Sequence, residues 1–141
     1  MARSHRLGRR GEALAAAYLE ARGWRILERS FRSGHREIDL IAAREGVVIF
    51  VEVKTRGGTG LGHPLEGITR KQRGEIAAVA RAWIGARSGA VRRPSFPPPG
   101  AAGSSRLDGP TTFRFDAIAI VIEPGRPPKI EHLEDAWRIG F

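Results

Sequence analysis

Four charged side chains lie close together in the sequence, in a stretch whose other residues are mostly apolar. Glu37 and Asp39 are two residues apart, and so are Glu52 and Lys54. Because side chains alternate between the two faces of a β-strand, each pair would project from one face of its strand. Charged groups are rarely buried without a partner or a metal ion. Three carboxylates and a lysine on neighbouring buried strands therefore indicate a metal-dependent active site.

Asp39 and Glu52 are the best pair of metal ligands in this segment. Twelve residues separate them, enough for a half-strand, a turn and a half-strand that return both side chains to one height. Magnesium prefers such hard oxygen ligands. Lys54 could activate the attacking water or stabilise charge developing on a phosphate, so the set is typical of phosphodiester hydrolysis. Glu37 could add an oxygen, and Glu12 could reach the site if its helix packs over the sheet.

Simpler explanations exist for each of these residues. Glu52 and Lys54 could form an ion pair at a strand end, and Glu12 could be an ordinary acid in the first turn of a helix. Glu37 could be a solvated residue at the start of its strand, which makes it the least certain member of the set. Asp116 lies beside Arg114 in a strong strand, where an ion pair is the favoured interpretation. The histidines are scattered in expected loops without metal-ligand spacing, and only His35 is near enough to the site to watch.

The elements that must position these residues follow from the hydrophobic pattern. We expect one domain over residues 1–141, of α/β class, with a mixed sheet flanked by helices in the order α-β-β-β-α-β. Residues 1–6 are expected to be a loose basic segment and residues 88–111 a low-complexity, disordered or surface loop. The predicted elements are a helix at 7–22, strands at 24–31, 36–42 and 47–53, a helix from 69, a strand at 113–122, and a weak edge strand at 129–133 followed by a helical turn at 134–139.

The helix that begins at Thr69 has two notable features. Thr69 and Gln72 have the spacing of a capping box. Arg70, Lys71 and Arg73 crowd its first turn, where the helix dipole disfavours cations, so they either contact phosphate or point to solvent. A glycine-rich loop over residues 57–64 precedes this helix and is either a functional loop or a plain connector.

Charge and composition narrow the classes of partner. The formal net charge is +9 and the pI is near 11.4, which favours a polyanion such as nucleic acid, with an anionic membrane surface as the alternative. A genome-wide bias towards arginine would look the same. The absence of cysteine excludes disulfides, thiolate zinc sites and cysteine nucleophiles. No apolar run approaches the roughly 20 residues that span a bilayer, and no signal peptide is expected, so the predicted location is cytoplasmic.

A longer string of motifs resembles a known family. Gly11-Glu12-Ala13, Glu37-Ile38-Asp39-Leu40-Ile41, Val51-Glu52-Val53-Lys54-Thr55-Arg56, Lys71 opening a helix and Arg114-Phe115-Asp116 together resemble the bacterial YraN family. That family is similar to Holliday-junction resolvases within the restriction-endonuclease-like PD-(D/E)xK superfamily. The segment 89–110 departs from the resemblance, since it looks longer than the family's usual connector.

The resemblance implies a three-layer restriction-endonuclease-like fold and a DNA endonuclease that depends on Mg²⁺ or Mn²⁺, with selectivity for branched DNA as a further expectation. It implies metal ligands at Glu12, Asp39 and Glu52, a catalytic lysine at Lys54, and a supporting polar residue at Lys71 or Gln72. A homodimer is also implied. The nucleic-acid-binding residues that we predict are Arg36, Arg56, Arg70 and Arg73. The alternative function is a nucleic-acid-binding module that keeps the nuclease fold without cleaving.

Overall fold

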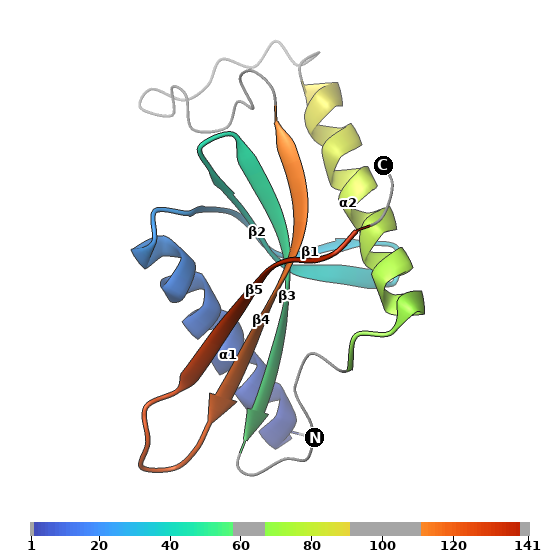
Figure 1. Cartoon of the computed structure of the whole chain (residues 1–141). Helices are drawn as coiled ribbons and strands as arrows, with labels where there is room; N and C mark the ends of the chain where they lie inside the picture. Colours follow the sequence, from blue (N-terminus) through green and yellow to red (C-terminus); the bar gives the residue numbers. More distant parts are fainter. Residues whose placement is uncertain (1, 58–66, 91–110, 139–141) are drawn as a thin grey trace.

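The computed structural model describes residues 2–57, 67–90 and 111–138, and shows a five-stranded sheet with one helix against each face (Figure 1). The elements are α1 (Ala2–Ala21), β1 (Arg25–Ser33), β2 (Arg36–Arg44), β3 (Val47–Gly57), α2 (Arg70–Ala90), β4 (Thr112–Ile122) and β5 (Lys129–Trp137). The expected mixed α/β architecture is confirmed, with a fifth strand completing the order α-β-β-β-α-β-β. Within these described ranges, no helix is long and apolar enough to cross a membrane.

The strand order in the sheet is the order in the sequence, β1-β2-β3-β4-β5. β1 pairs antiparallel with β2, and β2 antiparallel with β3. β3 and β4 are parallel, with α2 in the connection between them, and β5 returns antiparallel to β4. This is the predicted meander of three strands followed by a helical crossover.

β3 is the central strand and is buried on both faces. Its residues alternate, so that Val48 and Phe50 pack on the α2 side, where Phe50 meets the Trp83 ring edge-on at 5.7 Å between centroids. Ile49 and Val51 pack on the α1 side, with Leu19 of the helix. Burial on both faces explains why this strand is almost continuously apolar instead of alternating with polar residues.

Two helix boundaries differ from the sequence-based expectation. α1 begins at Ala2, so residues 2–6 are helical and not a loose segment. The physical reason is that alanine and arginine are good helix formers and the first glycine is Gly8. α2 continues to Ala90 and takes in the first three residues of the expected 88–111 loop. The expected loops at 91–110 and, for the most part, at 57–64 lie outside the described residues.

The predicted helical turn near the C-terminus is wrong, because β5 continues as a strand to Trp137. Its register against β4 shifts between the pairs Ala117–Leu133 and Phe115–Trp137, which indicates a bulge. Asp135 lies in that bulge with a φ of 52°. Beyond it, the Trp137 ring stacks on Phe115 at 5.4 Å between centroids, so burial of the tryptophan favours a strand over a helical turn.

The candidate functional site lies where the pairing between β2 and β3 ends. β2 pairs with β3 from Arg44–Val47 to Leu40–Val51 and no further, whereas its pairing with β1 continues to Ser33–Arg36. The hairpin end of β1 and β2 therefore leaves the sheet at Leu40 and turns towards α2, as the cyan strands in Figure 1 show. A pocket lined by residues of both strands opens at this divergence.

Candidate metal centre

Asp39 lies at the point where β2 leaves β3. Its Oδ2 atom accepts a hydrogen bond of 2.7 Å from the backbone N–H of Val53 on β3. Because the ladder has ended one pair earlier, the carboxylate takes the place of a backbone acceptor for this amide. The bond bridges the opening and fixes the position of the Asp39 side chain.

Two further carboxylates meet Asp39 in this opening. One oxygen each from Glu12 of α1, Glu37 of β2 and Asp39 lie within 4.8 Å of one another, and all three residues are half-buried. Glu12 reaches the group because α1 rests directly on β3 at the preceding residue. A Cβ atom placed on Gly11 would lie 1.8 Å from Oγ1 of Thr55, so only glycine permits this approach.

Glu52 and Lys54 face the same opening from β3. They alternate with Val51 and Val53, whose side chains pack on the α1 side, so they project to the other face. Glu52 is 9% exposed, and its Oε1 lies 3.9 Å from Nζ of Lys54. Both line a pocket of about 290 Å³ whose lining residues are Arg32, His35, Arg36, Glu37, Asp39, Glu52, Lys54 and Gln72.

Burial, together with the repulsion between neighbouring carboxylates, raises the pKa of Asp39, Glu52 and Glu12. Burial raises the pKa of Asp39 to about 8, the charges of Glu52 and Glu12 add to the shift, and the Val53 amide opposes it. Burial also raises the pKa of Glu52, against the opposing effect of Lys54 and Arg36. For Glu12, burial raises the pKa, a hydrogen bond with Asp39 opposes the shift, and the charge of Glu37 adds to it.

Burial and the proximity of like charges disfavour the ionised forms of these carboxylates. Four carboxylates face one lysine, 3.9 Å from Glu52, and the arginines of the pocket, of which Arg32 pairs with Glu37 at 3.6 Å. A divalent cation would offset their repulsion, and carboxylate oxygens are the hard donors that Mg²⁺ and Mn²⁺ prefer. The residues present therefore fit a metal ion, which Glu12, Glu37 and Asp39 could hold.

The start of α2 places Gln72 at the pocket and directs Lys71 elsewhere. The predicted capping box is confirmed, since Gln72 N donates to Thr69 Oγ1 at 3.1 Å and Thr69 N donates to Gln72 Oε1 at 3.0 Å. Gln72 lines the pocket, whereas Lys71 is exposed and is absent from the lining. Of the two supporting residues that the sequence analysis proposed, the geometry favours Gln72.

The four predicted nucleic-acid-binding arginines are not gathered at one place. Arg36 lines the pocket and pairs with Glu75 of α2 at 3.6 Å. Arg70 is exposed at the start of α2. Arg73 is half-buried with its guanidinium 5.8 Å from the Trp137 ring centroid, and Arg56 is half-buried near the end of β3.

The grouping of the ligands differs from the sequence-based set in one respect. The carboxylates that converge are Glu12, Glu37 and Asp39, while Glu52 lies beside them and pairs with Lys54. Sequence reasoning also missed Arg32 as a lining residue and left His35 only as a residue to watch. The available signal was their place in the basic turn directly before Glu37.

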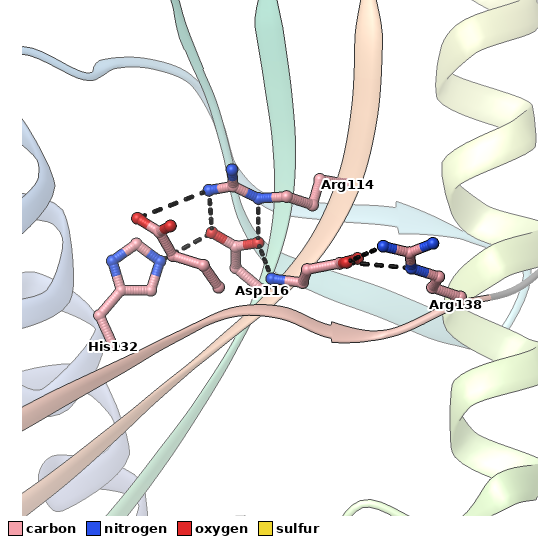
Figure 2. Close-up of polar contacts among 6 residues, drawn as sticks. Arg114, Asp116, His132 and Arg138 are labelled. Atoms are coloured by element: carbon pink, nitrogen blue, oxygen red, sulfur yellow. Dashed lines mark hydrogen bonds and ion pairs between the residues drawn. The ribbon is translucent and has the colours of Figure 1, made fainter.

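Asp116 belongs to a separate network, which Figure 2 shows. Its carboxylate is fully buried and accepts hydrogen bonds from Arg114 Nε at 2.7 Å and Nη2 at 2.8 Å, and from Asp135 N at 3.0 Å. His132 Nε2 lies 2.7 Å from Oδ2. Burial raises the pKa of Asp116, but these bonds outweigh it and hold the pKa below its usual value. None of these residues lines the pocket, and the expected ion pair is confirmed.

Comparison with known proteins places the chain in a family. A sequence model described as "Uncharacterised protein family UPF0102" matches residues 11–120, a span that includes every residue of the candidate metal centre. The chain is 39% identical to a UPF0102 protein of Rhodococcus opacus over 97% of the chain and 100% of the relative. It is 37% identical to one of Trichlorobacter lovleyi over 96% and 92% of the two chains. It is 38% identical to one of Chlorobaculum parvum over 95% and 93%. The chain belongs to the UPF0102 family, which confirms the YraN-like resemblance of its motifs.

Proposed function

We propose that this protein is a metal-dependent endonuclease that hydrolyses phosphodiester bonds in DNA. The observation that carries the proposal is the convergence of Asp39, Glu52 and Lys54, from two neighbouring strands, on one pocket. Neither strand alone creates the site, which exists because β2 leaves β3 beside Asp39. Placing charged side chains at a break in a buried sheet lowers the stability of the fold. Residues that lower stability in this way are expected at functional sites.

Glu12, Glu37 and Asp39 would hold the metal ion through their carboxylate oxygens. A bound Mg²⁺ or Mn²⁺ would act as a Lewis acid on a phosphoryl oxygen and offset the negative charge of the site. The hydrogen bond from Val53 N keeps Asp39 fixed, and the contact of Gly11 with Thr55 keeps Glu12 within reach. A ligand set held from both strands and a helix is preorganised for binding.

Lys54 and Glu52 would act on the reacting groups. The ammonium of Lys54, held 3.9 Å from Glu52, would stabilise the negative charge that develops on the phosphate oxygens. Burial raises the pKa of Glu52, which makes its carboxylate a stronger base for accepting a proton from the attacking water. Gln72 would orient that water or the substrate from α2.

A polyanionic substrate suits the rim of the pocket. Arg32, His35 and Arg36 from the β1–β2 hairpin line one side of it, and the exposed Arg70 and Lys71 lie at the start of the helix that supplies Gln72. Cations at a helix N-terminus are disfavoured by the dipole, and a bound phosphate would compensate for that cost. DNA, and branched DNA in particular, is the substrate that the likeness to resolvases predicts.

The test is cleavage of labelled single-stranded, duplex, flapped and four-way-junction DNA in Mg²⁺ or Mn²⁺. We expect metal-dependent cleavage that falls by roughly 10²–10³-fold in Asp39→Asn, Lys54→Met and Glu12→Gln. Glu20→Gln is the matched control for Glu12→Gln, since Glu20 is on the same helix but exposed and pairs only loosely with Arg29 at 3.9 Å. The proposal fails if no substrate is cut, or if the cleavage persists unchanged in all three site variants.

The same panel separates the enzyme from a binding module. Metal-independent DNA binding that Lys54→Met leaves intact, without cleavage by the wild-type protein, would favour the module. Its affinity should then fall steeply with salt concentration.

A further inference from the structure

A second concavity lies at the opposite end of the β2–β3 hairpin from the candidate metal centre. Its volume is about 550 Å³. The described residues that line it come from the end of α1, the start of β1, the β2–β3 turn and the residue before β4: Arg22, Gly23, Arg25, Ala43, Arg44, Glu45, Gly46, Val47, Val48 and Thr111. It shares no lining residue with the metal-centre pocket, so it requires an explanation of its own.

Two of the three arginines in this concavity are held in place by their surroundings. Nη1 of Arg44 donates to the backbone oxygen of Arg22 at 2.8 Å, and the guanidinium lies 4.4 Å from the ring centroid of the buried Trp24. Nη1 of Arg22 donates to the backbone oxygen of Tyr18 at 3.2 Å, with the guanidinium 3.7 Å from the Tyr18 ring. Each contact uses one N–H or one face of the group and leaves other N–H donors available.

The charge of these arginines is not balanced by neighbouring acids. In the part of the chain that the structure describes, Arg22, Arg25 and Arg44 form no ion pair with a carboxylate. By contrast, Arg29 and Arg32 on the same β1 strand each have a glutamate partner. Glu45 is the single acid among three arginines in the lining. Among the described residues, the lining therefore carries excess positive charge, with two of its arginines held in place by hydrogen bonds.

The remaining walls suit a small ligand with an apolar part. Val47 supplies apolar surface on the same side of the sheet as Arg44, since it packs against the α1-side cluster and pairs with Arg44 across the β2–β3 ladder. Gly23 and Gly46, with φ of 88° and 78°, form the turns that border the concavity. The volume falls in the range of roughly 300–1,000 Å³ that small-molecule sites occupy. Guanidinium groups bind phosphate through paired N–H donors.

We propose that this concavity is a second, phosphate-binding site that takes a nucleotide phosphate ester. The phosphate would lie on Arg22 and Arg44, on the α1 side of the sheet, with the nucleoside against Val47. The phosphate ester can belong to a free mononucleotide or to a nucleic-acid strand. The site stands apart from the proposed nuclease centre and does not depend on its activity.

The experiment measures binding in EDTA, so that the metal centre does not contribute, at a fixed 100 mM salt. The probes are inorganic phosphate, adenosine monophosphate, and a tetrathymidylate with and without a 5′-phosphate. Calorimetry gives the affinity, and amide chemical shifts of Gly23 and Gly46 report the location. Arg22→Gln is the main variant, because Arg22 is exposed and its loss should not affect folding. Arg29→Gln is its matched control, an exposed arginine that does not line the concavity.

We expect Arg22→Gln and Arg44→Gln each to weaken the binding of phosphate-bearing probes about tenfold, with Arg29→Gln changing the affinity less than twofold. Binding of adenosine monophosphate would identify a free nucleotide, whereas binding of the phosphorylated oligonucleotide alone would identify a nucleic-acid strand. The proposal is overturned if no probe binds, if Arg22→Gln binds like the wild type, if Arg29→Gln loses as much affinity, or if the shifts occur only around the metal-centre pocket.

Discussion

Gly11 provides a sharp test of how the candidate metal centre is positioned, because it is the point where α1 lies on β3. A Cβ atom there would be 1.8 Å from Thr55 Oγ1, 2.8 Å from its Cβ and 2.9 Å from its Cγ2. Rotation of the Thr55 side chain moves Oγ1 and Cγ2 but not Cβ, which is attached to the strand backbone. Gly11→Ala must therefore lift the helix by roughly 1–2 Å before ordinary contact is restored.

The sign of the effect on stability separates packing from helix propensity. In an open helical position, replacing glycine by alanine stabilises by up to about 1 kcal/mol. Overpacking a tight contact costs about 1–3 kcal/mol. We therefore expect Gly11→Ala to lower the free energy of unfolding by about 1 kcal/mol, or a melting temperature lower by a few degrees. Since Glu12 is carried by the same turn, we also expect about tenfold weaker Mn²⁺ binding.

Urea denaturation and Mn²⁺ calorimetry measure the two effects. Gly8→Ala is the matched control, because Gly8 lies in the same helix with nothing within 4 Å of its added Cβ. It should be stabilised by about 0.5–1 kcal/mol and keep its Mn²⁺ affinity. In the double variant Gly11→Ala/Thr55→Gly the clash is gone, so the two changes should couple favourably relative to the sum of the single variants. The reasoning is refuted if Gly11→Ala is as stable as Gly8→Ala and binds Mn²⁺ as tightly as the wild type.

Two further predictions concern buried carboxylates. The pKa of Asp39 is raised to about 8 in the folded protein, so between about pH 4 and about pH 8 the folded state binds more protons than the unfolded state. The metal-free protein should therefore lose stability as the pH rises from about 4 to about 8. Asp39→Asn should flatten this slope in urea titrations in EDTA, whereas Glu20→Gln should keep it; an unchanged slope in Asp39→Asn contradicts the assignment. Asp116→Ala should cost about 3–5 kcal/mol, because it removes the fully buried carboxylate that accepts hydrogen bonds from Arg114 and from the N–H of Asp135. Loss of the exposed Arg126–Glu123 pair in Arg126→Ala should cost under about 0.5 kcal/mol, and equal effects of the two variants would contradict the network's role.

The local patterns of the sequence were sufficient to predict the central elements. The apolar run from Val47 to Val53 indicated a strand covered on both faces, and β3 is that strand. The spacing of Thr69 and Gln72 indicated a capping box, and both of its hydrogen bonds form. The period-two spacing of Glu52 and Lys54 placed both on one face of β3, and both line one pocket.

The features that the sequence did not predict depend on contacts between segments that are distant along the chain. Whether Glu37 or Glu52 joins Glu12 and Asp39 is decided by the point at which β2 leaves β3, and no local pattern records that point. The continuation of β5 past Leu133 depends on Asp116, which accepts a hydrogen bond from the amide of Asp135 in the bulge. The arginine-lined concavity likewise forms only because the end of α1 meets the β2–β3 turn.

The central claim is that the carboxylates at the break between β2 and β3 hold a divalent cation. Crystals soaked in Mn²⁺ test it directly through the anomalous scattering of the ion. The account predicts one strong peak within bonding distance, roughly 2.0–2.3 Å, of carboxylate oxygens from Glu12, Glu37 and Asp39, which disappears in Asp39→Asn. The absence of a peak at these residues at saturating Mn²⁺, or a peak that survives in Asp39→Asn, would contradict the account.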